Sequence, residues 1–323
     1  MSKKLELKKL GFALTEQMFD MNVDPSALYE TNAIEMYRRA MIGEDSSRSK
    51  FKQIYGIKDR VKLGTVDFQN VVKPGACDFD PTDSDISQRT FEVCPIMIGT
   101  SFCIEDLETT FVSDQIGRGS KDFSEPTAFM NYFYETLQKV VDEELEILTW
   151  QGDTGATPSS YLNACDGLEV ILGNTASGTL YPATASAVDI NNVVSKLIEA
   201  RTAVPKGVKN KPDFVYMVST NVWEAYQDAI SDNQASGQYF LGSQAPLNFQ
   251  GTPIVKVDGA SDDVIVAGQT SNFLYITDLL ADTQGFNVVD FMKTALNRRI
   301  GVRTDAKVSW DVVRYNEVFF HKP

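Results

Sequence analysis

Residues 125–153, EPTAFMNYFYETLQKVVDEELEILTWQGD, decide the architecture of this chain. Glu125 and Pro126 suit the start of a helix and Gly152 suits its end. Between them, apolar residues recur every three or four positions, the spacing of one face of an amphipathic helix: Phe129, Phe133, Leu137, Val140, Val141, Leu145 and Leu148. The pattern predicts a helix over 126–151. At 1.5 Å per residue it would be about 39 Å long, so it needs a long surface to lie on.

Composition narrows the classes of protein that this chain can belong to. Of its 323 residues, 43% are hydrophobic and 23% charged, which is ordinary for a soluble globular protein. No apolar run has the length of a membrane span, and polar residues follow the first four residues where a secretory signal would be apolar, so we expect synthesis in a cytoplasm and no membrane partner. The net charge of −14 predicts at most weak, non-specific contact with DNA. We interpret the basic groups as solvated surface or salt-bridge partners: Lys3, Lys4, Lys8, Lys9, Arg298, Arg299 and Arg303.

The residues used most often in catalysis and metal binding are scarce. Cys77, Cys94, Cys103 and Cys165 form no C-x-x-C pair, and His321 is the single histidine. We therefore expect reduced, buried cysteines and an exposed or half-buried His321. The chain has no phosphate-binding glycine loop, no dinucleotide fingerprint, no G-x-S-x-G and no H-E-x-x-H. The sequence predicts no catalytic residue, no cofactor and no metal ligand.

Two groups of carboxylates are candidates for chemistry. Four lie within residues 78–85, where clustered oxygens could attract a hard cation such as calcium: Asp78, Asp80, Asp83 and Asp85. The calcium-loop pattern is not met, and we favour a solvated hairpin tip or an electrostatic contact between subunits. The second group, Glu143, Glu144 and Glu146, falls on the predicted helix, where solubility explains it better than glycosidic chemistry.

The chain before the long helix has few helical signals. Residues 1–60 read as an arm with a polar break at 43–50. Strand-forming residues occupy 61–72 and 90–104, and the turn-rich, acidic 74–87 separates them. These three segments predict a long hairpin with an acidic tip. Because a two-stranded hairpin is marginal in water, we expect it to lie on a neighbouring subunit.

After the helix and a loop over 154–187, a compact α/β unit is predicted. Asp189 can cap a helix whose apolar face holds Ile190, Val193, Val194, Leu197 and Ile198. A strand, a second helix and further strands alternate after it: 214–218, 221–230, 253–257, 263–267 and 272–277. The chain closes with strands that we expect beside the long helix: 286–292, 296–303, 307–315 and 318–321.

This order of parts resembles the major capsid protein of tailed bacteriophages, whose fold is shared with encapsulins and the herpesvirus capsid floor. Four local segments carry the resemblance together with the order: LTWQGD (148–153), FVYMVSTN (214–221), FQGTPIV (249–255) and RRIGVRTD (298–305). The resemblance implies an α+β capsid fold of four parts: an N-terminal arm (1–60), an extended β-hairpin loop (61–105), a peripheral domain (106–184 and 286–323) with spine helix 126–151, and an α/β axial domain (185–285).

The resemblance also implies a function without an active site. Copies would assemble as pentamers and hexamers, through arm and extended loop, into an icosahedral shell around double-stranded DNA. The implied partners are other copies, a portal, a separate scaffolding protein and weakly contacted DNA; the implied location is the virion, after assembly in the cytoplasm of a host bacterium. Lys62 and Lys73 are candidates for the lysine that some members cross-link, but no pattern identifies the partner asparagine, so no covalent chemistry is predicted. The alternatives are an encapsulin-like nanocompartment shell, a tail-tube or other virion protein, and a carboxylate-dependent hydrolase built on the acidic segment 78–85.

Overall fold

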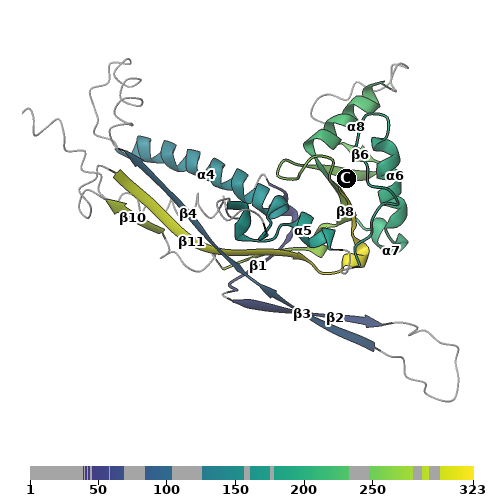
Figure 1. Ribbon diagram of the computed structural model, residues 1–323, viewed down its shortest axis with the longest axis horizontal. Coiled ribbons are helices and arrows are strands. Elements are labelled where there is room, and N and C mark those ends of the chain that lie inside the picture. Colours follow the sequence, from purple (N-terminus) through teal and green to yellow (C-terminus); the bar gives the residue numbers. More distant parts are fainter. Residues whose placement is uncertain are drawn as a thin grey trace, which may run out of the picture.

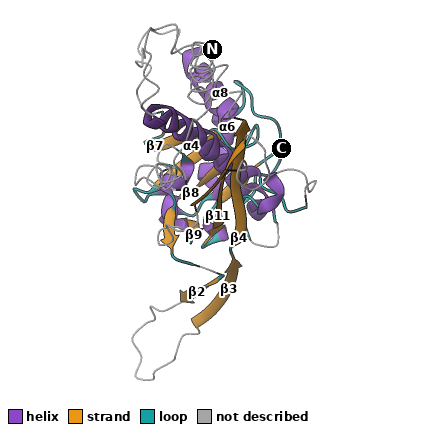
Figure 2. Cartoon of the chain, turned by 90° about the vertical axis from the view of Figure 1, so that its left-hand side faces the viewer, coloured by secondary structure: helices purple, strands orange, loops and turns teal. Residues whose placement is uncertain are grey.

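The computed structural model describes residues 39, 41, 43, 46–57, 59–68, 84–103, 126–155, 161–174, 178–232, 247–278, 286–290 and 299–323. Figure 1 shows a body built from a long helix, two sheets and a group of shorter helices, with a two-stranded ribbon that projects from it. The projection is clear in Figure 2, where β2 and β3 extend away from every other strand.

The long helix α4 spans Pro126–Gln151, as predicted. Val141, Leu145 and Leu148 are at most 5% exposed and belong to the main hydrophobic core. Val140 was placed on the same apolar stripe, which is wrong, because it is 44% exposed. The last turn contributes Trp150, which is completely buried. The second half of the helix therefore packs on the body through these side chains.

The surface beneath α4 is a five-stranded sheet centred on β11 (Arg299–Val312). β4 (Cys94–Cys103) pairs along one side of β11, whereas β10 (Phe286–Asp290) and β9 (Phe273–Thr277) pair along the other. β1 (Lys52–Tyr55) adds to β9 in parallel, so the end of the expected arm is part of the body. The two strands expected over 296–303 and 307–315 form one strand, because Asp305 lies on the exposed face of a regular alternation. Val308, Trp310 and Val312 lie in the same core as α4, which confirms that closing strands pack beside it.

A second sheet has the order β12-β8-β5-β7-β6. Its strands are β5 (Phe214–Ser219), β6 (Asn248–Phe249), β7 (Thr252–Val257), β8 (Ile265–Gln269) and β12 (Phe319–His321). The helices that belong with this sheet are α6 (Val193–Ala203), α7 (Lys206–Lys209) and α8 (Thr220–Asp232). α5 (Leu168–Gly173) packs with α4 instead, and its Leu168 and Leu172 lie in the main core. Single 3-10 turns are η2 (Ser47–Lys50), η3 (Tyr161–Ala164), η5 (Thr270–Asn272) and η6 (Tyr315–Glu317).

Both faces of the second sheet are buried. Along β5, Val215 and Met217 point into the core that includes α4, and the alternate residues Phe214, Tyr216 and Val218 enter a second core beneath α6 and α8. Such double burial explains why β5 reads as a continuous apolar run. On α6, Val193 and Leu197 are buried as predicted, but three residues expected on the same face are exposed: Ile190, Val194 and Ile198.

Strand pairing differs from the ranges expected for the extended loop and the two domains. The hairpin consists of β2 (Arg60–Phe68) and β3 (Ser84–Glu92), and β4, expected as its second strand, belongs to the body sheet. β9 lies in the sheet of β11, and β12 in the sheet of β8. The division into a peripheral and an axial domain remains a proposal, treated below.

Candidate functional site

The projecting hairpin is the most unusual surface of the described molecule. β2 and β3 pair from Arg60 opposite Glu92 to Phe68 opposite Ser84, and within the described chain neither strand pairs with any other. The outer side chains at the start of the ribbon are exposed, among them Lys62 and Thr90. An isolated two-stranded ribbon is marginal in water, so this one needs either a partner surface or a firm base.

Arg89 on β3 fastens the hairpin to the end of β11. Its guanidinium donates to the carbonyl oxygens of Val312 and, at 3.1 Å, of Val313. It also lies over two rings, 5.2 Å from the centroid of Phe91 and 4.5 Å from that of Tyr315, within the range of cation–π attraction. One side chain thus joins the hairpin to the turn that follows the central strand of the body.

A buried carboxyl supports this clamp. The Tyr315 hydroxyl donates to Asp311 Oδ1 at 2.6 Å. Burial raises the pKa of Asp311, although the hydrogen bond from Tyr315 and the charge of Arg89 act in the opposite direction. Burial and the neighbouring Asp311 carboxyl raise the pKa of the Tyr315 hydroxyl. The hydroxyl therefore stays protonated and holds the ring beneath the guanidinium.

Apolar contact adds a second fastening at the hairpin base. Phe91 of β3 is 7% exposed and packs with Leu274 and Ile276 of β9, which are almost completely buried. Leu63 and Val93 pack against the same cluster. The hairpin is therefore anchored through its base, whereas its outer part projects.

A disulfide between Cys94 and Cys165 completes the base, with the Cα atoms 5.7 Å apart. The expectation of reduced cysteines is wrong for this pair. Cys94 begins β4 directly after the hairpin, and Cys165 follows η3, in the connection from α4 to α5. Spacing could not predict the pairing, because the two residues are 71 positions apart and are brought together by the fold. Cys77 and the side chain of Cys103 lie outside the described part of the structure.

The N-terminal segment is tied to α4 by a buried ion cluster. Arg48 is completely buried; it contacts Asp142 Oδ1, and its Nε lies 3.3 Å from Glu146 Oε2. The Ser47 N–H donates to Glu146 Oε1 at 3.1 Å, and the Trp150 indole N–H donates to Ser47 Oγ at 2.9 Å.

Sequence reasoning missed this cluster. The interpretation of residues 43–50 as a polar break is wrong, as is the solvated role given to Glu146, whereas Glu143 and Glu144 are exposed as expected. One signal was available: Asp142 and Glu146 lie four residues apart, beside the buried side of the helix.

Other residues singled out from the sequence lie apart. His321 is completely buried rather than exposed, with Nδ1 3.0 Å from the Asp263 carbonyl oxygen, and burial lowers its pKa. Asp85 lies in β3 opposite Asp67. Several candidates fall outside the described residues: Asp78, Asp80, Asp83, Lys73, Arg298 and the four N-terminal lysines. Asp85 is thus the one member of the acidic segment whose backbone is placed.

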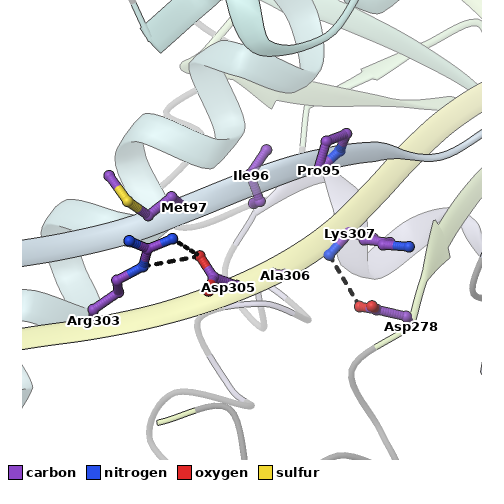
Figure 3. A pocket seen from close by; sticks show the side chains of 8 residues that line it. All are labelled: Pro95, Ile96, Met97, Asp278, Arg303, Asp305, Ala306 and Lys307. Carbon is purple, nitrogen blue, oxygen red and sulfur yellow. Dashed lines mark hydrogen bonds and ion pairs between the residues drawn. The ribbon is translucent and has the colours of Figure 1, made fainter. Parts of the chain in front are cut away.

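The exposed face of β4 and β11 holds a hollow of about 320 Å³ (Figure 3). Arg303 is paired within the hollow, because its Nη2 lies 3.0 Å from Asp305 Oδ1, and the backbone N–H of Lys307 donates to Asp278 Oδ1. Met97 beside them is 61% exposed. Within the described ranges, no three His, Cys, Asp or Glu residues are grouped to hold a metal, and no helix is long and apolar enough to cross a membrane.

Comparison with known proteins identifies the fold. No family model and no curated protein matches the sequence. Among solved structures, a chain of the satellite phage P4 procapsid that includes the size determination protein has 12% identity and a TM-score of 0.57, with 89% of this chain and 98% of that chain covered. The capsid of an empty GTA particle has 14% identity and a TM-score of 0.55, with 86% of this chain and 89% of that chain covered. A virus-like particle from Pyrococcus furiosus has 8% identity and a TM-score of 0.52, with 91% of this chain and 99% of that chain covered. The predicted α+β capsid fold is confirmed over most of the chain.

Proposed function

We propose that this protein is the major capsid protein of a tailed bacteriophage, whose copies assemble as pentamers and hexamers into an icosahedral shell around double-stranded DNA. One observation carries the proposal: the β2–β3 ribbon projects from the body, pairs with no other described strand and is fastened firmly at its base. A ribbon anchored in this way suits contact with a neighbouring copy. The likeness to capsid chains supports the same conclusion.

We assign a peripheral and an axial role to two parts of the body. In this proposal, α4 with the sheet of β11 forms the peripheral part, and α6, α7 and α8 with the sheet of β5 form the axial part that meets its copies around the symmetry axes. We include β9 in the proposed peripheral part because it pairs with β11, and β12 in the proposed axial part because it pairs with β8. The N-terminal arm would reach a further copy from its anchorage at Arg48.

The remaining partners follow from charge and assembly. A net charge of −14 favours weak, non-specific contact with packaged DNA over tight binding. We expect a portal and a separate scaffolding protein, assembly in the cytoplasm of the host bacterium, the virion as final location, and no enzymatic activity.

The test is electron microscopy of the purified full chain, with size-exclusion chromatography and light scattering on the same sample. In the key variant, residues 65–87 are replaced by Asn-Gly, which closes the ribbon between the paired residues Gly64 and Gln88 and keeps the base intact. We expect the parent chain to form closed shells, or rings of five or six, and the variant to fold without closing shells. Arg60→Ala is the control, because it removes only the exposed ion pair with Glu92. A monodisperse parent monomer or dimer at high concentration, or closed shells of the shortened variant, would refute the proposal.

Two alternatives give different results in the same preparation. An encapsulin-like shell would carry protein cargo in place of nuclease-protected DNA. A carboxylate-dependent hydrolase would lose activity when the four aspartates of 78–85 are replaced by asparagine, whereas a capsid protein would change only in assembly.

A further inference from the structure

The Cys94–Cys165 disulfide lies where the hairpin joins the body. β3 ends at Glu92 and β4 begins at Cys94, so Val93 alone separates the two strands. Figure 1 shows β4 leading from the body toward the ribbon, so a change of backbone angle at this position would redirect the ribbon. The disulfide holds the residue that follows this junction.

The other end of the disulfide is held rigidly. The Gly167 N–H donates to the Gly152 carbonyl oxygen at 2.7 Å, and the Trp310 indole donates to the Asp166 carbonyl oxygen at 2.5 Å. A β-carbon added at Gly152 would lie 2.2 Å from the Cys165 carbonyl oxygen, which shows how closely these segments pack. The disulfide therefore ties the junction to a fixed corner of the core.

The other restraints at the junction are non-covalent. The Val93 N–H donates to the Asp59 carbonyl oxygen at 3.2 Å, and Arg89 and Phe91 make the contacts described above. Arg89 and Phe91 lie in β3 and Val93 is the junction residue, so all three precede β4. Opening the disulfide would leave the start of β4 held by its pairing with β11, beginning at Val308, and by the packing of Cys94 against the main core.

We propose that Cys94 and Cys165 form a redox-sensitive brace, open as a dithiol in a reducing cytoplasm and closed as a disulfide in oxidising surroundings, which sets how freely the hairpin pivots at Val93. Its meaning for assembly rests on the proposed function: subunits made in a cytoplasm would seat their hairpins with the brace open, and particles outside the cell would hold them with the brace closed. Cytosolic thiols are kept reduced, and disulfides persist outside the cell.

The chemistry of closure is thiol–disulfide exchange with a small-molecule disulfide. Cys94 is the more exposed of the two residues, because it is half-buried whereas Cys165 is 4% exposed. The Cys94 thiolate attacks one sulfur of the external disulfide and releases one small thiol; the Cys165 thiolate then attacks the mixed disulfide and releases the second. Each step breaks one sulfur–sulfur bond and forms one, so that in the net reaction the external disulfide is replaced by the Cys94–Cys165 disulfide. Two protons pass from the cysteines to the released thiols, and two electrons pass from the protein to the external disulfide.

Peptide mass spectrometry and hydrogen exchange on unassembled full-length subunits test the brace. After equilibration with oxidised glutathione, the peptides of Cys94 and Cys165 should be linked, in the parent chain and in the control Cys103→Ser. Backbone amides at the start of β4 and the end of β3 should exchange about tenfold more slowly in the linked protein than after reduction. Cys94→Ser and Cys165→Ser should exchange like the reduced parent under both conditions.

Two results would overturn the brace: no linked peptide after equilibration with oxidised glutathione, or equal exchange at the hairpin base in the oxidised and reduced parent. Both measurements use subunits, so they do not depend on shell formation. A failure of the capsid proposal appears in the microscopy instead.

Discussion

Arg48→Met removes the positive charge from the cluster that ties the N-terminal segment to α4. The Arg48 side chain has no exposed surface, and 9% of the Glu146 side chain is exposed. Breaking a buried ion pair by removing one partner typically costs about 3–5 kcal/mol, because the remaining charge is left desolvated. Glu146 meets this condition, whereas Asp142, at 27% exposed, can be hydrated. We expect a loss of about 3–5 kcal/mol in the free energy of unfolding, a large part of a typical domain's stability.

A second substitution separates desolvated charge from lost packing. In Arg48→Met/Glu146→Gln the buried charge is gone, and the amide oxygen can still accept the Ser47 N–H. We therefore expect this variant to unfold within about 2 kcal/mol of the parent. Arg60→Met is the matched control; its partner lies in an exposed ion pair, so the loss should stay below about 1 kcal/mol.

Urea unfolding of unassembled subunits, followed by tryptophan fluorescence, measures these differences. Trp150 reports directly on the site, because its indole N–H donates to Ser47 Oγ. The reasoning fails if Arg48→Met loses less than about 1 kcal/mol, or if the double variant is no more stable than the single one.

Three further outcomes are expected. Reducing the Cys94–Cys165 link should lower the free energy of unfolding by about 4 kcal/mol in the chain-entropy estimate for 71 residues, measured in urea with and without reductant. Gly259→Ala should lower the free energy of unfolding by about 1–3 kcal/mol, because its β-carbon would lie 2.5 Å from a carbonyl oxygen of α4. Gly207→Ala, whose β-carbon would have no atom within 4 Å, should leave the free energy of unfolding unchanged or raise it by up to about 1 kcal/mol. Thermal unfolding of the two variants compares them. Burial lowers the pKa of His321 below 6.5, so the unfolded chain binds more protons between the two pKa values; unfolding free energy should fall as the pH drops below 6.5, and His321→Gln should reduce this slope.

The long helix and the short buried strands could be predicted from the sequence because each signal is local. In α4 a regular apolar stripe is bounded by Pro126 and Gly152, and the helix begins and ends as predicted. β5 is a short apolar run buried on both faces, and it was predicted within one residue. The ends of such segments are marked by residues within or next to the segment itself, so no distant partner is needed to predict them.

The hairpin base and the arm anchor could not be predicted, because their partners are distant in sequence. Arg48 meets its carboxylates 94 and more positions later, and a lone arginine in a polar stretch does not reveal them. Asp305 resembles a turn residue between two strands until the pairing places it on the exposed face of β11. The assignment of a strand to a sheet likewise depends on its pairing: β4 is expected from the sequence in the hairpin, but it pairs with β11 in the body.

The sheet that separates the two cores couples them into one rigidly packed body. Val215 and Met217 fill one core, Tyr216 and Val218 fill the other, and a tilt of either helical layer would open voids on both sides. A displacement of α6 and α8 would therefore also disturb the packing of α4 on the other face of this sheet. In the proposed capsid, with its pivot at Val93, the subunit would accommodate a change of curvature by swinging its ribbon while its two cores keep their relative position.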